Sequence, residues 1–368
     1  MTVASGFEPL EELLRGFAEA TPGYTAQLAI LQGGQPLIDI SVGDISTTDL
    51  SGVYSCTKAA AAAVVGMLVQ RGQLVLNAPV ATYWPEFAAA GKGDITVDEL
   101  LTHRAGLLGI DGGVSMYEYL DSQAIAQRLA QLPTMWRGTS MFTYHTITMG
   151  VFAEELVRRV TGSTLQQVFE DEFRSPHGID FYLGLPEALE DRYVRVRKPL
   201  EAWPESFVDP FGIQGIGLNS TTGFIDEAGQ QSFDFFEVPN LRVVRASGLA
   251  ALGGVASARG LAEFFAVLPT VIQPATLHEM TTLKVFGTDV ATGLPGAFGT
   301  IFQKPRQDFD FGSWRAYGHA GFNGALSYAD PMYGLSVGYL PLHAELTGTG
   351  SRSDQISKLV RQLILKNG

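Results

Sequence analysis

The sequence predicts an α+β fold in which an antiparallel sheet, flanked by helices, is interrupted by an inserted domain that is mostly helical. Three observations support this prediction. Runs typical of β-strands occur near both ends of the chain, helical patterns accompany them at both ends, and residues 74–173 are mainly helical. A sheet built from both chain ends leaves the middle of the chain as an insertion. We therefore expect a discontinuous sheet domain, residues 1–73 and 243–368, and an inserted domain, residues 74–242.

The first elements are a helix and a hairpin. Residues 7–20 place apolar side chains at helical spacing with acidic residues between them, which predicts a helix that packs on a sheet. Residues 24–31 and 37–42 are short β-rich runs on either side of Gln32-Gly33-Gly34-Gln35-Pro36. A glycine-containing connection of this length is typical of an antiparallel hairpin.

An alanine-rich stretch follows, from Val53 to Arg71. Alanine is the strongest helix former, so this stretch predicts a helix that begins near Ser55 and ends at Gly72. Ser55 is then at the helix N-terminus. Unpaired backbone N–H groups and the positive end of the helix dipole favour a developing oxyanion there.

The rest of the chain is predicted in the same way. After Leu74 we expect a short helix that starts at a threonine cap, Thr96, and then helices over 121–132, 147–160 and 164–173. Residues 184–242 break this pattern, and a loop of that length is uncommon unless it covers a site. Near the C-terminus we expect helices over 258–268, 274–283 and 351–365, and strands over 297–302, 315–319, 324–329 and 334–340.

Composition excludes several classes of function. The chain has 368 residues, 46% hydrophobic and 17% charged, which is typical of a soluble protein with a large core. The net charge of -13 argues against nucleic acid or an anionic membrane as a partner. Cys56 is the single cysteine, so neither a disulfide framework nor a thiolate metal site is expected. Met1 to Gly6 lacks the pattern of a signal peptide, and we expect a cytoplasmic protein.

The candidate nucleophile is Ser55. Lys58 follows it by just under one helical turn, so the two side chains share a face and the amine can reach the hydroxyl. A Ser-x-x-Lys pair is a weak pattern by itself, since a serine cap before an exposed lysine is common. Here no other serine has a lysine three residues later, and the flanking helix is too apolar to leave Lys58 in water.

Three motifs together resemble the penicillin-recognising serine hydrolases, in the branch of class C beta-lactamases, DD-peptidases and family VIII carboxylesterases. The motifs are Ser55-Cys56-Thr57-Lys58, Tyr144-His145-Thr146 and Gly318-His319-Ala320-Gly321-Phe322-Asn323-Gly324. The resemblance implies a beta-lactamase/transpeptidase-like fold and covers most of the chain, thinning between Gly184 and Val255. Residues 100–107 and 176–179 also look like family landmarks.

The resemblance implies a role for each motif. Serine needs a partner that takes its proton, and the resemblance gives that role to Lys58 and Tyr144. Tyr144 would be partly or transiently anionic, favoured by the Lys58 charge, and which of the two is the base stays open. The resemblance also implies an oxyanion hole from the backbone N–H groups of Ser55 and Phe322, with Gly321 allowing close approach of the strand.

Two departures from the family pattern favour simple esters as substrates. Lactamases and DD-peptidases commonly have Lys-Thr-Gly in the third motif and Tyr-x-Asn in the second. His319 replaces the cation that would hold a carboxylate, and Thr146 replaces the amide that would bind a peptide-like side chain. A simple carboxylic ester needs neither group. The aromatic residues between Trp203 and Phe236 form either a small apolar pocket or part of the core.

Two other patterns are weaker candidates. Gly334-Leu335-Ser336-Val337-Gly338 spells the nucleophile elbow of α/β-hydrolases, but it lies inside an expected strand with no helix after it. Cys56 points away from the face shared by Ser55 and Lys58, so we interpret it as a buried small side chain. The histidines show no metal-ligand spacing, and His103 and His177 are interpreted as structural turn residues.

The function predicted from the sequence is a serine carboxylesterase acting on short-chain esters through an acyl-enzyme on Ser55, with the active site in a cleft between the two domains. No cofactor and no metal are expected, and the expected partner is a small-molecule ester, with no nucleic acid or membrane. An acyltransferase, a D-amino-acid peptidase or a weak beta-lactamase would use the same residues. A catalytically idle relative that only binds acylated ligands is an alternative of another class.

Overall fold

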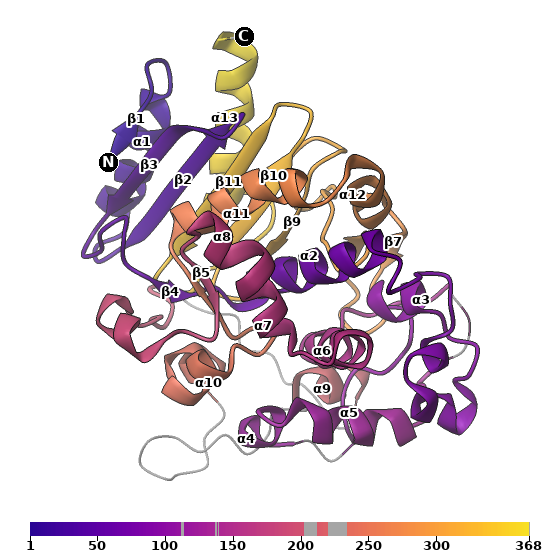
Figure 1. Cartoon of the computed structure of the whole chain (residues 1–368). Coiled ribbons are helices and arrows are strands. Elements are labelled where there is room, and N and C mark those ends of the chain that lie inside the picture. Colours follow the sequence, from indigo (N-terminus) through magenta and orange to yellow (C-terminus); the bar gives the residue numbers. More distant parts are fainter. Residues whose placement is uncertain (112–113, 137, 139, 202–211, 220–233, 368) are drawn as a thin grey trace.

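The computed structural model describes residues 1–367 except 112–113, 137, 139, 202–211 and 220–233. Its main element is a six-stranded antiparallel sheet with the order β1-β3-β2-β11-β10-β9. The strands span Thr2–Val3 (β1), Ala26–Gln32 (β2), Gln35–Val42 (β3), Tyr317–Ala320 (β9), Leu326–Asp330 (β10) and Leu335–Pro341 (β11). Strands β2 and β11 pair in the centre, so the two ends of the chain form one sheet, as the α+β prediction requires (Figure 1).

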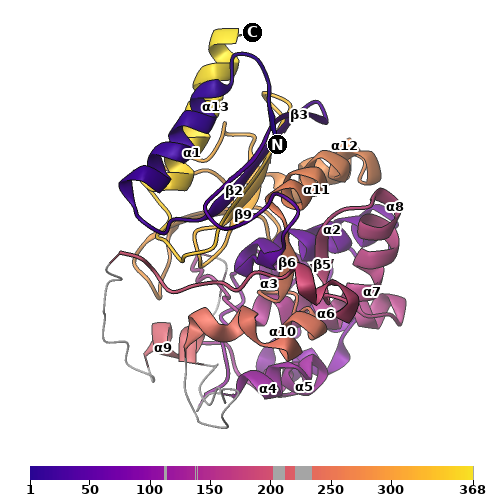
Figure 2. The ribbon, with the colours of Figure 1, turned by 90° about the vertical axis from the view of Figure 1, so that its left-hand side faces the viewer.

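Helices cover both faces of this sheet. Helices α1 (Glu8–Ala20) and α13 (Arg352–Asn367) lie side by side on one face, as Figure 2 shows. Helix α11 (Ala258–Val271) packs against β2, β10 and β11 on the other face, next to α12 (Pro274–Thr281). The predicted helices at both chain ends are confirmed, with boundaries that differ from the expected ones by at most three residues. The largest difference is at α11, which continues three residues beyond its expected end.

The predicted hairpin forms with a tighter turn than expected. Gln32 and Gln35 pair with each other, so only Gly33 and Gly34 connect the strands. Both glycines have positive φ, 55° and 78°, which the two-residue turn between antiparallel strands requires. The five-residue connection predicted from the sequence is therefore wrong, because two adjacent glycines allow the shortest turn.

The middle of the chain is mostly helical, as predicted. Its helices are α3 (Val97–Leu101), α4 (Met116–Tyr119), α5 (Ser122–Gln131), α6 (Thr148–Thr161), α7 (Leu165–Phe169), α8 (Ser175–His177), α9 (Ile213–Asn219) and α10 (Arg242–Ser247). A small sheet of β4 (Ser51–Gly52), β6 (Gly254–Ala256) and β5 (Phe181–Leu183) joins this part to the rest of the chain. A second small sheet consists of β7 (Val285–Thr288) and β8 (Pro295–Phe298). The division at residues 73 and 242 into two domains stays a prediction.

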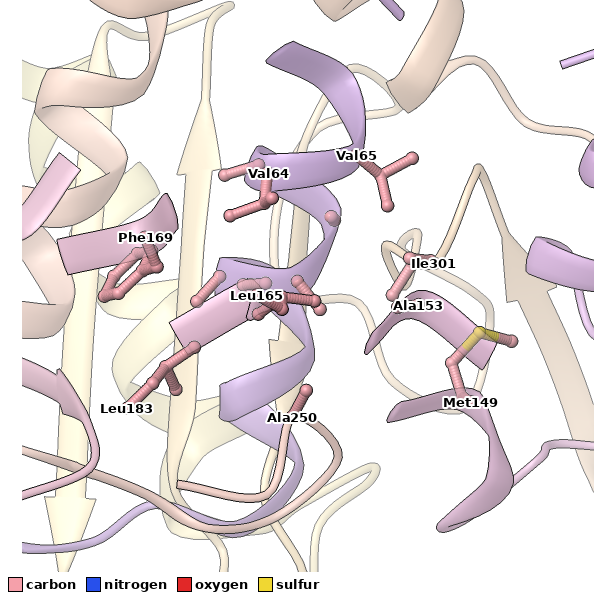
Figure 3. Packing of buried hydrophobic residues seen from close by; sticks show 14 of the residues in the cluster. Val64, Val65, Met149, Ala153, Leu165, Phe169, Leu183, Ala250 and Ile301 are labelled. Carbon is pink, nitrogen blue, oxygen red and sulfur yellow. The ribbon is translucent and has the colours of Figure 1, made fainter. Parts of the chain in front are cut away.

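The alanine-rich helix α2 (Thr57–Gln70) is the centre of the core. It is buried on all sides through Leu68, and its small side chains let neighbouring helices approach closely. Figure 3 shows Val64 and Val65 of α2 among Leu165 and Phe169 of α7 and Met149 of α6. A helix enclosed in this way provides a rigid base for the residues at its N-terminus.

Helix α2 begins two residues later than predicted. Ser55 lies in a separate 3₁₀ turn, Tyr54–Cys56, that leads into α2 at Thr57. Tyr54 has a positive φ of 44°, a costly conformation for a non-glycine residue, and this bend separates the turn from a regular helix start. Within the described residues, no helix combines the length and apolar character needed to cross a membrane.

Candidate active site

Hydrogen bonds on both sides of Ser55 hold its turn in place. The Tyr54 hydroxyl donates to the Phe235 carbonyl at 2.9 Å. The Thr57 hydroxyl donates to the Tyr54 carbonyl and accepts from the Gly254 N–H at 2.9 Å. Because these partners come from distant parts of the chain, the turn that presents Ser55 is fixed by the tertiary structure.

Lys58 is the nearest candidate base. Its Nζ lies 3.0 Å from Ser55 Oγ, 2.7 Å from the Thr146 carbonyl oxygen and 2.8 Å from the Ala251 carbonyl oxygen. Burial holds the pKa of the Lys58 amine well below its usual value. A neutral amine has two N–H groups and one lone pair. Donation to the two carbonyls leaves that lone pair facing the serine hydroxyl.

Tyr144 precedes α6 and lies next to the same group. Its ring stacks on Phe298, with centroids 5.9 Å apart and planes at 11°, and Lys58 Nζ lies 5.0 Å from the ring centroid. Burial raises the pKa of the Tyr144 phenol, opposed by its hydrogen bond with Ser55. Burial therefore disfavours both the phenolate of Tyr144 and the ammonium of Lys58 in the resting site. The transient anion expected of Tyr144 during the reaction stays a prediction.

His319 points its ring at Tyr144 from strand β9. Its Nδ1 lies 2.9 Å from the Ala320 carbonyl oxygen, which can only accept, so Nδ1 carries the proton. Its Nε2 is then an acceptor, 3.5 Å from the Tyr144 hydroxyl. Burial, with a smaller effect of Lys58, lowers the pKa of His319 to about 3. The imidazole is neutral at physiological pH and offers no charge to a substrate carboxylate.

The loop after β9 approaches the turn of Ser55 very closely. A Cβ at Gly321 would lie 2.6 Å from the Val53 carbonyl oxygen, so only glycine fits there. Gly321 donates its N–H to the Ala325 carbonyl at 2.7 Å, and the buried Asn323 side chain donates to the Gly52 carbonyl at 3.2 Å. Phe322, between them, is thereby held beside the segment that precedes Ser55.

An aromatic cluster surrounds Phe322. Its ring lies 5.7 Å from that of Tyr54, 4.8 Å from that of Phe235 and 5.4 Å from that of Phe236. Phe322 is 37% exposed, so it forms an accessible apolar surface next to the serine. Five other aromatic residues of the expected wall lie outside the described residues: Trp203, Phe207, Phe211, Phe224 and Phe233.

Comparison with known proteins identifies the family. The sequence model of the Beta-lactamase family matches residues 10–347. The chain belongs to this family. Its structure is similar to that of EstA from Arthrobacter nitroguajacolicus Rue61a, with a TM-score of 0.93 and 42% identity, covering 100% of this chain and 99% of the other.

Two further relatives of this Beta-lactamase family member carry esterase names. A family VIII carboxylesterase superimposes with a TM-score of 0.86 at 26% identity, covering 99% of each chain. "Esterase/beta-lactamase LipL" of Mycobacterium tuberculosis (strain ATCC 25618 / H37Rv) is 27% identical over 352 residues, 88% of this chain and 79% of LipL. The resemblance to penicillin-recognising hydrolases and family VIII carboxylesterases is confirmed, and the chain is a serine hydrolase.

Several residues that support this site were not predicted from the sequence. Asp289, in the β7–β8 loop, accepts from the backbone N–H of Tyr144 at 2.7 Å and from those of Ala291 and Thr292. The carbonyls of Thr146 and Ala251 orient Lys58. No residue type is required to supply a carbonyl, and Asp289 lies far from Tyr144 in sequence, so no local pattern indicates these contacts.

His103, interpreted from the sequence as a turn residue, has a positive φ of 67° and lies behind Tyr144. Its Nδ1 accepts from the His145 N–H at 3.0 Å, and its ring centroid lies 5.0 Å from that of Tyr144. The histidine therefore contacts the ring of the candidate catalytic tyrosine and holds the backbone of the next residue. In the sequence, the only indication of this role is that His103 lies within residues 100–107, which resemble the family.

The weaker candidates have other environments. Ser336 lies within β11, paired with Ala329 and Leu31, so the strand–turn–helix context of a nucleophile elbow does not occur at this serine. Cys56 is buried, its Sγ donates to the His319 carbonyl at 3.2 Å, and burial raises the pKa of the thiol to about 12. No group of three or more metal-ligating side chains gathers within the described part of the chain.

Proposed function

We propose that the protein is a serine carboxylesterase that hydrolyses short-chain carboxylic esters through an acyl-enzyme on Ser55. The observation that carries the proposal is the 3.0 Å contact between Ser55 Oγ and the amine of a buried Lys58, whose pKa burial holds well below its usual value. The esterase names of EstA, LipL and the family VIII neighbour support the substrate class.

In the proposed first step, Lys58 takes the proton of Ser55 while Oγ attacks the ester carbonyl carbon. The oxyanion that forms accepts hydrogen bonds from the backbone N–H groups of Ser55 and Phe322. Collapse breaks the bond to the alcohol oxygen, which takes the proton of the Tyr144 hydroxyl. The Lys58 ammonium returns that proton to the phenolate, leaving an acyl-enzyme and a neutral amine.

Water then reverses this sequence. It loses a proton to Lys58 as it attacks the acyl carbon, and Ser55 leaves as the hydroxyl after the proton returns to it. Before each proton transfer the neutral His319 accepts from the Tyr144 hydroxyl and so orients the phenol. Because His319 and Thr146 replace a cation and an amide, this site lacks the groups that would hold the carboxylate and side chain of a beta-lactam or D-peptide.

The aromatic residues near Ser55 support an apolar acyl group in the substrate. Phe322 lies directly after Gly321, and its ring is close to those of Tyr54, Phe235 and Phe236. Phe322 is 37% exposed and offers an apolar contact to a short acyl chain. The dual name of LipL gives beta-lactam hydrolysis as the second candidate activity.

The test is hydrolysis of p-nitrophenyl esters from acetate to octanoate, with nitrocefin in parallel. We expect activity that falls with chain length, little nitrocefin turnover, and loss of ester activity in Ser55→Ala. Ser336→Ala is the matched control and should keep its activity. Faster turnover of nitrocefin than of any ester would reject the substrate class, while full activity in Ser55→Ala would reject the nucleophile.

A further inference from the structure

A cavity away from the candidate active site lies between α12 and the start of β9, two elements that Figure 1 labels. Its volume is about 660 Å³, within the range of small-molecule sites. Its lining is mainly apolar and includes Leu277, Leu283, Pro269, Pro274 and the indole of Trp314. None of the candidate catalytic residues lines it.

The ammonium of Lys304 lies in the lining of this apolar cavity and has neither an ion-pair partner nor a short hydrogen bond among the described residues. The residue is only 5% exposed, yet within the described residues its ammonium makes a single long hydrogen bond, 3.4 Å to the Arg315 carbonyl oxygen. The nearest acid, Asp330, already accepts from the Ser313 N–H at 2.7 Å and the Ser313 hydroxyl at 2.6 Å. A buried ammonium with unused donors is costly unless an anion pairs with it.

Tyr317 brings a second donor to the same place. Gln303 and Gly318 exchange backbone hydrogen bonds of 2.9 and 3.1 Å as an antiparallel pair, so the next pair, Lys304 and Tyr317, lies opposite on one face. Tyr317 is 2% exposed and lines the cavity. Lys304 and Tyr317 therefore both contribute polar groups to the lining of an apolar cavity.

The charged side chains that line the cavity are basic. Arg315 also contributes to the lining, and no aspartate or glutamate is among the described residues that line it, although the whole chain carries a net charge of -13. We propose that this cavity binds an amphipathic carboxylate, with its carboxylate on the Lys304 ammonium and the Tyr317 hydroxyl and its apolar part against Trp314 and Leu277. A carboxylate only accepts hydrogen bonds, which matches these donors, and its apolar part matches the walls.

Other ligand chemistries match less of the cavity. A neutral apolar molecule would leave the buried ammonium unpaired, whereas inorganic phosphate would leave the apolar walls uncovered. Burial, opposed by Asp330, lowers the pKa of Lys304 to about 8. A bound carboxylate raises that pKa again, so binding at pH 8 is accompanied by uptake of protons.

The probe is phenylbutanoate, and phenylbutanol is its uncharged match with the same apolar part. Binding to the whole protein is followed by isothermal titration in two buffers of different ionisation enthalpy, and by fluorescence of Trp314, which is 72% exposed. We expect saturable binding of phenylbutanoate with proton uptake at pH 8, and binding of phenylbutanol at least about tenfold weaker.

Three variants separate this site from the active site. Lys304→Met should weaken phenylbutanoate about tenfold or more and abolish the proton uptake, while Tyr317→Phe should weaken it severalfold. Lys366→Met removes the same charge from an exposed position on α13 and should change nothing. No saturable binding up to about 10 mM, or equal affinity in Lys304→Met and wild type, would overturn the proposal. If phenylbutanoate bound in the active site instead, Lys304→Met and the wild type would bind it with equal affinity.

Discussion

Lys58 is the residue on which the proposed chemistry depends, because it acts only when its amine is neutral. Arginine keeps the charge but stays protonated at every working pH, so Lys58→Arg should lose on the order of 10³-fold or more in kcat/KM. Lys92→Arg is the matched control. Lys92 is also fully buried, and it donates to the Ala89 and Ala130 carbonyls away from Ser55. Its variant should lose thermal stability and keep its activity per folded molecule.

The same residue predicts how activity depends on pH. The base must be deprotonated, and burial lowers the pKa of Lys58 well below 10.5. The rate should therefore rise with pH and reach its plateau well below that value. The profile of kcat/KM for p-nitrophenyl acetate, corrected for spontaneous hydrolysis, measures this. A rise centred near the ordinary lysine pKa would contradict a neutral amine in the resting site.

Tyr144 tests the second half of the proton path. Tyr144→Phe keeps the ring on Phe298 and removes only the hydroxyl, so folding should be preserved. We expect kcat to fall about 10²- to 10⁴-fold, the size usual for a proton-transfer group, with KM nearly unchanged. Steady-state kinetics with unfolding curves checks both. A variant with wild-type kcat would remove Tyr144 from the mechanism.

At the scale of elements, the contact between the loop after β9 and the Ser55 turn sets the candidate oxyanion hole. Gly321→Ala would place a methyl group 2.6 Å from the Val53 carbonyl and push Phe322 away, so kcat should fall by about 10²-fold or more. Gly16→Ala is the matched change on α1, where a Cβ meets nothing within 4 Å. It should leave activity unchanged and stabilise the protein by about 0.5–1 kcal/mol.

Elements with strong local signals could be predicted from the sequence, and those defined by distant contacts could not. Thr96 caps α3 through a reciprocal pair of hydrogen bonds with Glu99, a pattern visible in the sequence. Strand β7 was not predicted, because its four residues include a glycine and form a strand only by pairing with β8. The start of α2 was misplaced because the bend at Tyr54 depends on Phe235, far along the chain.

The candidate site shows the same distinction. Ser55, Lys58 and Tyr144 belong to motifs whose order along the chain is specific, so their proximity could be predicted. Asp289 could not, because its role follows from the position of a hairpin loop beside Tyr144. Lys304 and Tyr317 lie opposite each other only because of the strand register, and the sequence near these residues does not determine that register.

At the scale of the whole molecule, Glu345 links the two ends of the chain. Its side chain is 9% exposed, accepts from the Tyr339 hydroxyl at 2.7 Å and from Arg352 of α13 at 2.9 Å, and Tyr339 in turn bonds to the Tyr24 hydroxyl. Burial raises the pKa of Glu345 from 4.5 to about 7, with Tyr339 and Arg352 opposing the rise and Glu201 adding to it.

This shift predicts how stability depends on pH. A carboxyl whose pKa is raised by folding binds a proton more tightly in the folded state, so its contribution is full below about pH 4.5 and is lost as the pH rises through about 7. Glu345→Gln should therefore flatten the fall in the free energy of unfolding across that window. Denaturant titrations from pH 4.5 to 8 measure the difference between the two proteins. A parallel decline in both would show that another group titrates.

An acyl-enzyme on Ser55 is the intermediate of the proposed reaction, and it can be trapped. The protein is mixed with p-nitrophenyl butyrate, quenched in acid within the burst phase, digested and analysed by mass spectrometry. We expect a butyryl group on the peptide that contains Ser55, and none in Ser55→Ala. A butyryl group on Ser336, or steady turnover with no acylated peptide at all, would contradict it.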